Sequence, residues 1–382
     1  MTQLSITLAA VGDVLIDRPD PSSIFEYTAH ITKQADIAFC QLETPYSDKG
    51  SRGSSGPRGA NNKDPSNYAA IPAAGFDVVS IASNHAMDWG EDALLDCISR
   101  LRCDHIAAIG AGANIDEARK AAIVQKHDTR IAFLAYCSVA PKGYYAAARK
   151  PGVAPMRAIT HYEPLEDDQP GTPCDIFTYA HAADLACLVE DIRRTRNSAD
   201  VLVLSMHWGI HHIHGAVADY QKAVARAAID AGADIILGHH PHILKGIELH
   251  RGKAVFYSMG NFAFDIDVSS RALDVEWNER RKNVYRSHYR VTDAAAHPDD
   301  PYHAVSRFSM IVKASIEAKR IQRISFVPIL INARDQPTPQ SPQSSAGKAI
   351  LAYLKEASRD AELGEIGYSI QGDEFVIRAE EQ

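Results

Sequence analysis

Residues 200–242 read DVLVLSMHWGIHHIHGAVADYQKAVARAAIDAGADIILGHHPH, in which two apolar runs of strand length enclose a segment of helical character. The runs are DVLVLSMH at 200–207 and ADIILGHH at 233–240. The segment from Tyr220 to Ala231 between them carries apolar residues at helical spacing, namely Val224, Ala227, Ala228 and Ala231. A strand, a helix and a second strand in succession predict a layered α/β architecture.

The same alternation extends along the rest of the chain. Further strand-like runs are SITLAAVG at 5–12, IAFCQL at 37–42, FDVVSIAS at 76–83, TRIAFLAYC at 129–137 and AVFYSMGNF at 254–262. Helix-like stretches run from Asp92 to Leu101 and from Ala182 to Thr195. After residue 303, two or three β-like runs would finish a sheet or sandwich. We therefore expect residues 1–335 to form one catalytic domain.

The C-terminal residues 336–382 look structural. A Pro/Ser/Gln-rich linker from Gln336 to Ser345 leads to a helix near Lys348–Asp360 and to a last strand-like run, FVIRA, at 375–379. We expect this extension to pack on the same domain. Three other regions, 47–67, 141–173 and 265–303, look irregular, and loops of this length are usually lids, binding loops or disordered insertions.

Composition excludes several classes of function. The chain has 382 residues, 46% of them hydrophobic, and a formal net charge of -8, which gives no reason to expect a nucleic-acid partner. Its six cysteines form no CxxC pair, which indicates reduced packing residues. The N-terminus lacks the features of a signal peptide, and no apolar run has the length of a membrane helix, so we expect a cytoplasmic protein without a membrane anchor.

Polar side chains follow nearly every short strand run. Asp13, Glu43, Asn84-His85 and His207 each stand at or just beyond the end of an apolar run. Ligand sites in α/β sheets lie beyond the carboxyl ends of the strands, so these residues could meet in space although they are scattered in sequence. Simpler interpretations are a turn at Asp13, an ion pair for Glu43, a polar turn at Asn84-His85 and a core histidine at 207.

The run His239-His240-Pro241-His242 follows directly from an apolar strand. An H-x-H pair at the end of a strand can direct two imidazoles at neighbouring metal ions, whereas a chance cluster of solvated histidines is the alternative. Together, two carboxylates, one amide and three imidazoles suit a pair of divalent cations such as Mn, Fe or Zn. Asp88, three residues after His85, could hold that imidazole protonated as a general acid requires.

These motifs resemble the CapA family of capsule and poly-γ-glutamate biosynthesis proteins, which belongs to the calcineurin-like metallophosphatases. The matching stretches are GDVLIDR at 12–18, LETP at 42–45, SNHAMDWG at 83–90, HWG at 207–209, DYQKAVARAAIDAGADIILGHHPHILKGIE at 219–248 and GKAVFYSMGNFAFD at 252–265. The resemblance implies a four-layer α/β/β/α sandwich with a dimetal centre at the strand ends.

The resemblance also implies roles for single residues. Asp13 would bind one metal, Glu43 would bridge both, and Asn84 and His207 would serve the second. His240 and His242 would divide between the two metals, with His239 as the alternative to His240, and His85 would be the acid. The family often has an acidic residue two positions after HWG, where this chain has His211, followed by His212 and His214. We expect these histidines to face the substrate or to be structural.

The sequence therefore predicts a hydrolase in which a dimetal-bridged hydroxide attacks a phosphoester in a small or oligomeric anionic substrate. The substrate-binding candidates are His211, His239, Asn261, Asp265, Arg52, Arg58 and Tyr145. The same centre could instead attack an amide or ester carbonyl such as a γ-glutamyl link. A role as a non-catalytic subunit of polymer biosynthesis is the third possibility, and the sequence leaves the oligomeric state open.

Overall fold

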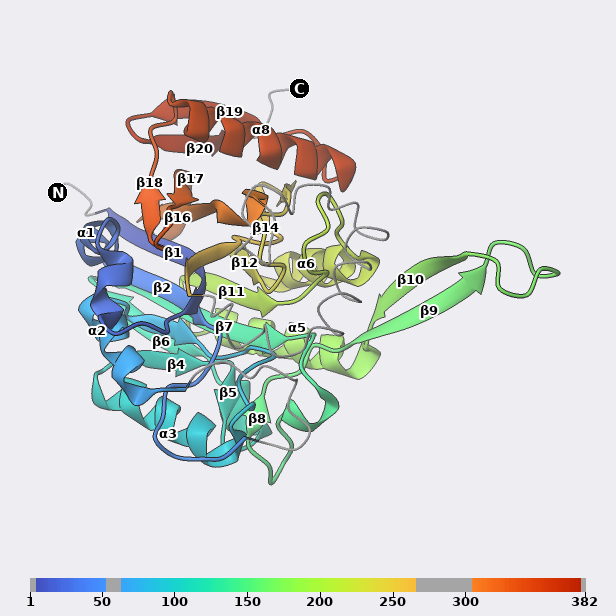
Figure 1. The fold of residues 1–382 in the computed structure, drawn as a ribbon, viewed down its shortest axis with the longest axis horizontal. Helices are drawn as coiled ribbons and strands as arrows, with labels where there is room; N and C mark the ends of the chain where they lie inside the picture. Colours follow the sequence, from blue (N-terminus) through green and yellow to red (C-terminus); the bar gives the residue numbers. More distant parts are fainter. Residues whose placement is uncertain (1–4, 53–62, 266–303, 379–382) are drawn as a thin grey trace.

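Two mixed β-sheets face each other, and helices cover the outer surface of each (Figure 1). The computed structural model describes residues 5–52, 63–265 and 304–378. The predicted insertion at 265–303, apart from Asp265, lies outside these ranges, as does Arg58. In the inter-sheet core, the ring of Phe39 stacks on that of Phe133 from the opposite sheet, with centroids 6.2 Å apart.

The first sheet joins a parallel half to an antiparallel half. Its strand order is β19-β20-β17-β16-β1-β2-β3-β4. The parallel strands are β1 (Ile6–Leu15), β2 (Ile37–Leu42), β3 (Val78–Ser80) and β4 (Ala107–Ile109). The antiparallel strands are β16 (Phe308–Glu317), β17 (Arg320–Ile331), β20 (Glu374–Arg378) and β19 (Gly367–Gln371). Two short strands, β15 (Asn261–Phe264) and β18 (Pro337–Pro339), pair with β1 and β17.

The second sheet has the order β13-β14-β12-β11-β7-β6. Its four central strands are parallel, namely β7 (Thr129–Cys137), β11 (Val201–His207), β12 (Ile235–His239) and β14 (Lys253–Phe256). The edge strands β6 (Ala122–Lys126) and β13 (Ile247–His250) are antiparallel. Parallel strands covered on both faces are expected to be apolar throughout, which explains why these runs show no polar alternation.

The side chains of the second sheet alternate between two cores. Phe133, Val203 and Leu237 belong to the core between the sheets, whereas Leu204 and Ile236 belong to the core beneath the helices. That outer core contains apolar residues of α5 (Ala182–Arg196) and α6 (Asp219–Ala231). The helices beside the first sheet are α1 (Ala29–Gln34), α2 (Ala70–Ala73) and α3 (Gly90–Cys103). The predicted four-layer α/β/β/α sandwich is confirmed.

The C-terminal segment extends the first sheet. Helix α8 (Ser345–Asp360) contacts β17, and β20 pairs with β17 at Ser325↔Val376. The predicted linker at 336–345 is not wholly irregular, because β18 lies within it. The remaining short elements are α4 (Ile115–Ala118), β5 (Ala111–Gly112), and the 3-10 turns Pro21–Phe25, Pro65–Ala69, Lys142–Tyr144 and Ala304–Arg307.

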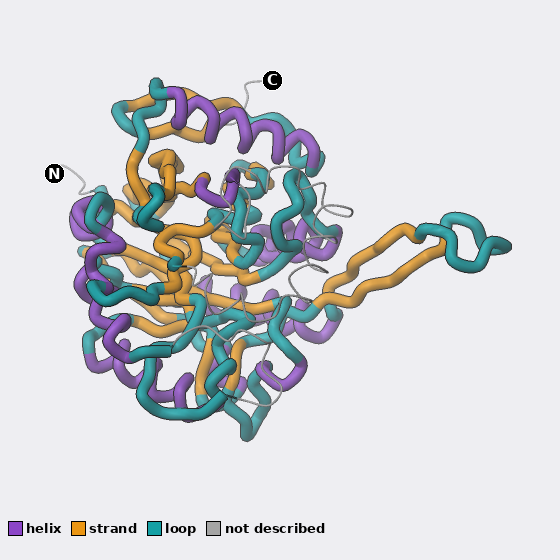
Figure 2. The backbone as a smooth tube through the Cα atoms, in the orientation of Figure 1, coloured by secondary structure: helices purple, strands orange, loops and turns teal. Residues whose placement is uncertain are grey.

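Two expectations about local structure were wrong. The region 141–173, expected to be irregular, contains β8 (Gly152–Val153) and β9 (Ala158–Pro164), and β9 pairs along its whole length with β10 (Cys174–Ala180). This hairpin projects from the body of the molecule (Figure 2). The run AVFYSMGNF is not one strand, since β14 ends in the second sheet and β15 begins in the first. The chain crosses between the sheets at residues 257–260.

All six cysteines are free thiols, as predicted. Cys40, Cys97 and Cys137 are buried, whereas Cys103 and Cys174 are exposed and so are not core residues. In the described ranges, no helix combines the length and the apolar character needed to cross a membrane.

Candidate metal centre

Strand ends from both sheets meet at one place. Asp13 lies near the end of β1, Glu43 follows β2 directly, His207 ends β11 and His239 ends the neighbouring β12. Ligand atoms of Asp13, Glu43 and His207 all lie within 4.8 Å of one another, and all three residues are fully buried. The structure thus brings together residues from positions 13 to 207, a span of 194 positions in the sequence.

Glycines allow the backbones to approach closely at this point. The amide of Asp13 donates to the carbonyl of Gly260 over 3.0 Å. A Cβ atom on Gly12 would lie 2.1 Å from that same carbonyl oxygen, and a Cβ on Gly238 would lie 2.3 Å from the oxygen of Tyr257. No other residue type fits either place without moving the backbone. Close packing against neighbouring backbone therefore explains why glycine precedes both Asp13 and His239.

The carboxylate of Glu43 has the surroundings of a metal ligand. Neither of its oxygens accepts a hydrogen bond in the described part of the chain, although both are buried. Burial, followed by the charges of Asp13 and Asp88, raises the pKa of Glu43 well above its usual value. Burial acts in the same direction on Asp13, but His239 and two further imidazoles outweigh it and lower the pKa of Asp13. A dication beside Glu43 would compensate this cost of burying a carboxylate.

Asn84, His207 and His240 converge on a second point. The amide oxygen of Asn84 lies 2.7 Å from Nε2 of His207 and 3.3 Å from Nδ1 of His240. The two imidazole rings have centroids 5.0 Å apart. Burial lowers the pKa values of His207 and His240 well below the usual range, so both rings are neutral near pH 7. Neutral imidazoles retain the lone pairs that metal binding needs.

His242 is oriented by two polar neighbours. Its Nδ1 lies 2.9 Å from the amide oxygen of Asn261 and 3.7 Å from Oδ2 of Asp13. The backbone amide of His240 donates to the same carboxylate oxygen over 3.1 Å. Both His240 and His242 have positive φ angles, 93° and 57°, which are uncommon for residues other than glycine. Asn261, a substrate-binding candidate in the sequence, is thus placed to orient His242.

His239 and His240 occupy different environments. Nδ1 of His239 lies 3.2 Å from Oδ1 of Asp13, and its ring faces Phe39 at 5.9 Å between the sheets. His240 instead lies against His207 and Asn84 on the other side of the centre. Both histidines are thus close to residues of the candidate ligand set. His239 lies beside Asp13, and His240 lies beside Asn84 and His207.

His85, Asp88 and Tyr144 form a hydrogen-bonded chain. Nδ1 of His85 lies 2.7 Å from Oδ2 of Asp88, and the hydroxyl of Tyr144 donates to Oδ1 of Asp88 over 2.9 Å. The other ring nitrogen of His85, Nε2, lies 4.0 Å from Oε1 of Glu43. The side chain of His85 is 19% exposed, whereas that of Asp88 is fully buried. This histidine can therefore face both the candidate metals and solvent.

The additional histidines lie on two sides of loop 209–218. The ring of His211 lies tilted against that of His240 with a centroid separation of 3.8 Å, and its centroid is 5.3 Å from that of His242. His212 is buried, 5.8 Å from the ring of His242. His214 turns away and contacts Tyr353 of α8. His211 is therefore the extra histidine that lies directly on the candidate ligands.

Two other sequence-predicted residues, Asp265 and Tyr145, contact residues outside the candidate ligand set. Asp265 forms an ion pair with Arg18 and accepts a hydrogen bond from the amide of Asp17. Tyr145 packs under the guanidinium of Arg157 at 5.9 Å. Arg52 is exposed at the edge of the described residues.

Tyr144 was missed by the sequence reasoning. Its position beside Tyr145 in an apparently irregular segment gave no signal that its hydroxyl contacts Asp88.

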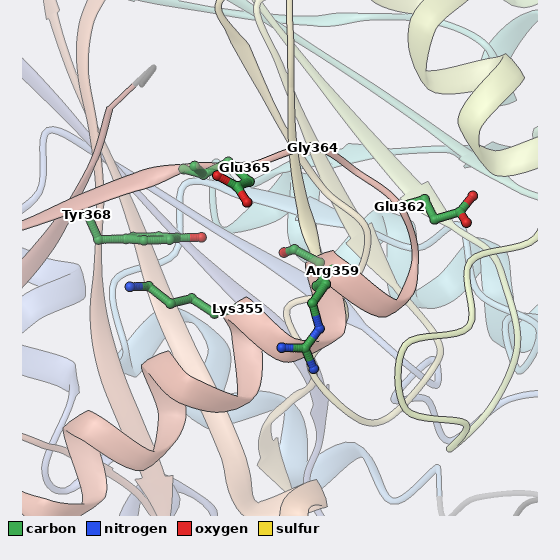
Figure 3. Close-up of a pocket in the computed structure, with 8 residues that line it drawn as sticks. Lys355, Arg359, Glu362, Gly364, Glu365 and Tyr368 are labelled. Carbon is green, nitrogen blue, oxygen red and sulfur yellow. The ribbon is translucent and has the colours of Figure 1, made fainter. Parts of the chain in front are cut away.

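A separate pocket lies in the C-terminal extension, far along the chain from these residues (Figure 3). It has a volume of about 410 Å³ and lies between the end of α8 and β19. Its charged lining residues have both signs, Lys355 and Arg359 against Glu362 and Glu365. None of the predicted site residues lines it, so it does not belong to the candidate metal centre.

Comparison with known proteins agrees with the geometry. The family model described as "Bacterial capsule synthesis protein PGA_cap" matches residues 7–266. The chain is 30% identical over 271 residues to the PGA biosynthesis protein CapA of Bacillus subtilis, covering 68% of this chain and 63% of that protein. It is 25% identical over 273 residues to the capsule biosynthesis protein CapA of Bacillus anthracis, covering 68% of this chain and 60% of that protein.

The chain thus spans less than two thirds of the length of these two relatives. Among solved structures, a novel phosphatase from Mycoplasma pneumoniae aligns with a TM-score of 0.45 and 12% identity, over 86% of this chain and 95% of that chain. The family match covers both sheets' parallel strands and every candidate ligand. The resemblance seen in the sequence is therefore confirmed, and the chain belongs to the bacterial capsule synthesis protein PGA_cap family.

Proposed function

We propose that this chain is a metal-dependent hydrolase whose preferred substrate is an anionic phosphoester. The observation that carries the proposal is the buried group of Asp13, Glu43 and His207, in which both Glu43 oxygens lack a hydrogen-bond donor among the described residues. A buried carboxylate in this state is costly unless a cation compensates it. A purely structural site would be expected to pair Glu43 with a lysine or arginine.

The donor set fits two divalent cations of the Mn, Fe or Zn type. It consists of two carboxylates, one amide oxygen and three imidazoles, from Asp13, Glu43, Asn84, His207, His240 and His242. Imidazole and carboxylate ligands in this mixture suit such cations better than Mg or Ca. When bound, such cations lower the pKa of water towards neutrality and neutralise charge on the reacting group.

His85 is the proton donor in this proposal. Asp88 accepts a hydrogen bond from Nδ1 of His85, which leaves Nε2 directed to the side where Glu43 lies. From that position Nε2 protonates the leaving oxygen as its bond to the reacting centre breaks. Asp88 is itself held by Tyr144, so the ring of His85 has a fixed orientation.

An amide or ester carbonyl is the second candidate electrophile. The relatives from Bacillus subtilis and Bacillus anthracis are named for PGA and capsule biosynthesis. A γ-glutamyl link would need the same activated water and the same proton donor. The names also leave room for a non-catalytic role in assembly, in which case the chain would have no hydrolytic activity of its own.

Parallel assays separate these candidates. Purified chain loaded with Mn, Fe or Zn is tested on aryl phosphate esters and on γ-glutamyl amides under the same conditions. We expect hydrolysis of the phosphate esters and little of the amides. The reverse preference would select the carbonyl candidate, and the absence of both activities with metal bound would favour the assembly role.

Replacing His85 tests directly whether it is the proton donor. We expect His85→Ala to lower kcat by about 10²–10⁴-fold, the contribution of a positioned general acid, while the metal content stays unchanged. The matched control is His250→Ala, since His250 lies at the surface beside Asp230 and should leave kcat unaltered. Loss of metal from the His85 variant would show that His85 is a ligand and not the acid.

A further inference from the structure

The β9–β10 hairpin, residues 158–180 with its connecting loop, forms an arm that projects from the body (Figures 1 and 2). Eight large apolar side chains are exposed in the described ranges, and six of them lie on this arm at 37–62% exposure. They are Ile159, Tyr162, Leu165, Ile176, Phe177 and Tyr179. Apolar side chains gathered on one exposed element are typical of an interaction surface.

Both faces of the arm carry apolar cross-strand pairs. Ile159 lies opposite Tyr179 on one face, and Tyr162 lies opposite Ile176 on the other. A two-stranded hairpin that packs on nothing is marginally stable in water. Within the described ranges, hydrogen bonds between Thr178 and the first residues of α6 hold the base of the arm. A partner surface would stabilise the outer part of the arm.

The arm is strongly acidic. Residues 158–180 contain five carboxylates and no lysine or arginine. The carboxylates are Glu163, Glu166, Asp167, Asp168 and Asp175. Glu163 lies directly opposite Asp175 in the hairpin, and like charges in this position repel each other. A basic partner surface would relieve that repulsion.

The segment that leads into the arm has the opposite charge. Residues 142–157 contain Lys142, Arg149, Lys150 and Arg157 and no acidic residue. Arg157 is paired with Asp184, but Lys142 and Arg149 are exposed and have no carboxylate within 4.0 Å among the described residues. The segment ends where the arm begins, and the arm extends away from it, so the acidic tip cannot fold back onto these cations.

We propose that two copies of this chain form a two-fold symmetric dimer in which the arm of each copy lies on segment 142–150 of the other. Two-fold symmetry generates the same contact between an acidic arm and a basic segment twice in the dimer. Each seven-residue strand spans about 23 Å, enough to cross to a neighbouring body. A specific interface needs roughly 1,000 Å² in all, and each arm contributes three exposed aromatic rings towards it.

The dimer would have a consequence for the candidate active site. Tyr144 lies within the basic segment and donates its hydrogen bond to Asp88, which holds His85. The arm of the second copy would therefore lie beside the residues that orient the proposed proton donor. The dimer itself does not depend on the hydrolase proposal, because it follows from exposed side chains and charges alone.

Sedimentation of the full chain over a range of concentrations tests the dimer. We expect a dimer at about 10 µM in low salt that weakens as the salt concentration rises towards about 1 M, since the opposite charges become screened. A variant in which Asn-Gly replaces residues 161–177 keeps the Thr160↔Thr178 pair and closes a tight turn, and it should be monomeric. Circular dichroism and thermal melting show whether each variant folds.

Charge exchange identifies the partner as a second copy. Lys142→Glu with Arg149→Glu should raise the dimer dissociation constant by about tenfold or more, and adding Glu163→Lys with Asp175→Lys should restore it. Ile123→Ser, and Arg320→Glu with Lys348→Glu, change exposed residues elsewhere and should have no effect. A monomeric wild-type chain, a dimer that survives loss of the arm, or a failure of the combined variant to restore dimerisation would each overturn the proposal.

Discussion

Tyr144 lies outside the matched sequence motifs, yet it helps to position the proposed proton donor His85 through Asp88. Its hydroxyl donates to one oxygen of the buried Asp88, and the other oxygen lies 2.7 Å from Nδ1 of His85. An imidazole with one nitrogen committed in this way has a defined tautomer and a defined ring orientation. The three residues are therefore expected to act as a unit.

A double-mutant cycle tests that unit. Tyr144→Phe removes one hydrogen bond but leaves Asp88 beside His85, so we expect kcat to fall by about tenfold, at the low end of what a hydrogen bond to a carboxylate contributes. In the His85→Ala background the same substitution should have no further effect on kcat, because the group that Tyr144 helps to position is absent. Full additivity of the two losses would mean that Tyr144 acts on the substrate and not through His85.

Contacts between site residues that are close in sequence were predictable, whereas contacts between residues far apart in sequence were not. The spacing of His85 and Asp88 predicted their contact because three residues span one turn. Tyr144 lies 56 residues after Asp88 and reaches it only because β7 and the following turn deliver it there. Asn261 gave a weaker signal through its position after a strand, and its contact with His242 required the pairing of β15 with β1.

At the scale of elements, close backbone contacts hold the strand ends together. Gly12→Ala would place a Cβ atom 2.1 Å from the carbonyl oxygen of Gly260, so β1 or the crossing segment must shift. We expect the free energy of unfolding to fall by about 1–3 kcal/mol and metal binding to weaken, as overpacking of this kind does elsewhere. Chemical denaturation and metal titration measure both. Gly143→Ala, which meets nothing within 4 Å, is the neutral control.

A buried lysine beside loop 209–218 makes stability depend on pH. Lys245 is almost fully buried and donates to the carbonyl of Ile213, and burial lowers its pKa from 10.5 to about 7. The unfolded chain therefore binds this proton more tightly than the folded chain, and the contribution of Lys245 to stability rises as the pH increases from about 7 towards 10.5. Below that window the contribution is constant and unfavourable.

Lys245→Met removes this dependence. We expect the stability difference between wild type and variant to shift in favour of wild type by up to about 1.4 kcal/mol per pH unit between pH 7 and 10. Urea denaturation of both proteins at several pH values measures it. A difference that stays constant across this range would show that Lys245 keeps an ordinary pKa in the folded chain.

Most elements followed from periodicity, and the failures have physical causes. The parallel strands β7, β11 and β12 are buried on both faces, which makes them visible as continuous apolar runs. The arm strands β9 and β10 are exposed on both faces, so they lack any pattern of burial in the sequence. The break between β14 and β15 depends on a change of sheet, which no local pattern records.

At the scale of the whole molecule, the fold places the ligand candidates between two sheets. Asp13, Glu43 and Asn84 lie at or beyond the ends of strands of the first sheet, whereas His207, His240 and His242 lie at or beyond the ends of strands of the second. Neither sheet alone supplies a complete set. Metal binding is therefore expected to join the two halves of the sandwich, and removal of metal by a chelator should lower the melting temperature of the wild-type chain.

Metal analysis of the purified chain by mass spectrometry, beside Glu43→Gln, tests the metal centre most directly. We expect about two equivalents of Mn, Fe or Zn in the wild type and a clear loss in the variant, because Glu43 would contact both metals. Glu374→Gln is the control, since that carboxylate is paired with Lys313 and should not affect metal content. A wild-type chain that holds almost no metal after gentle purification, and takes up none when Mn, Fe or Zn is added, would contradict the account.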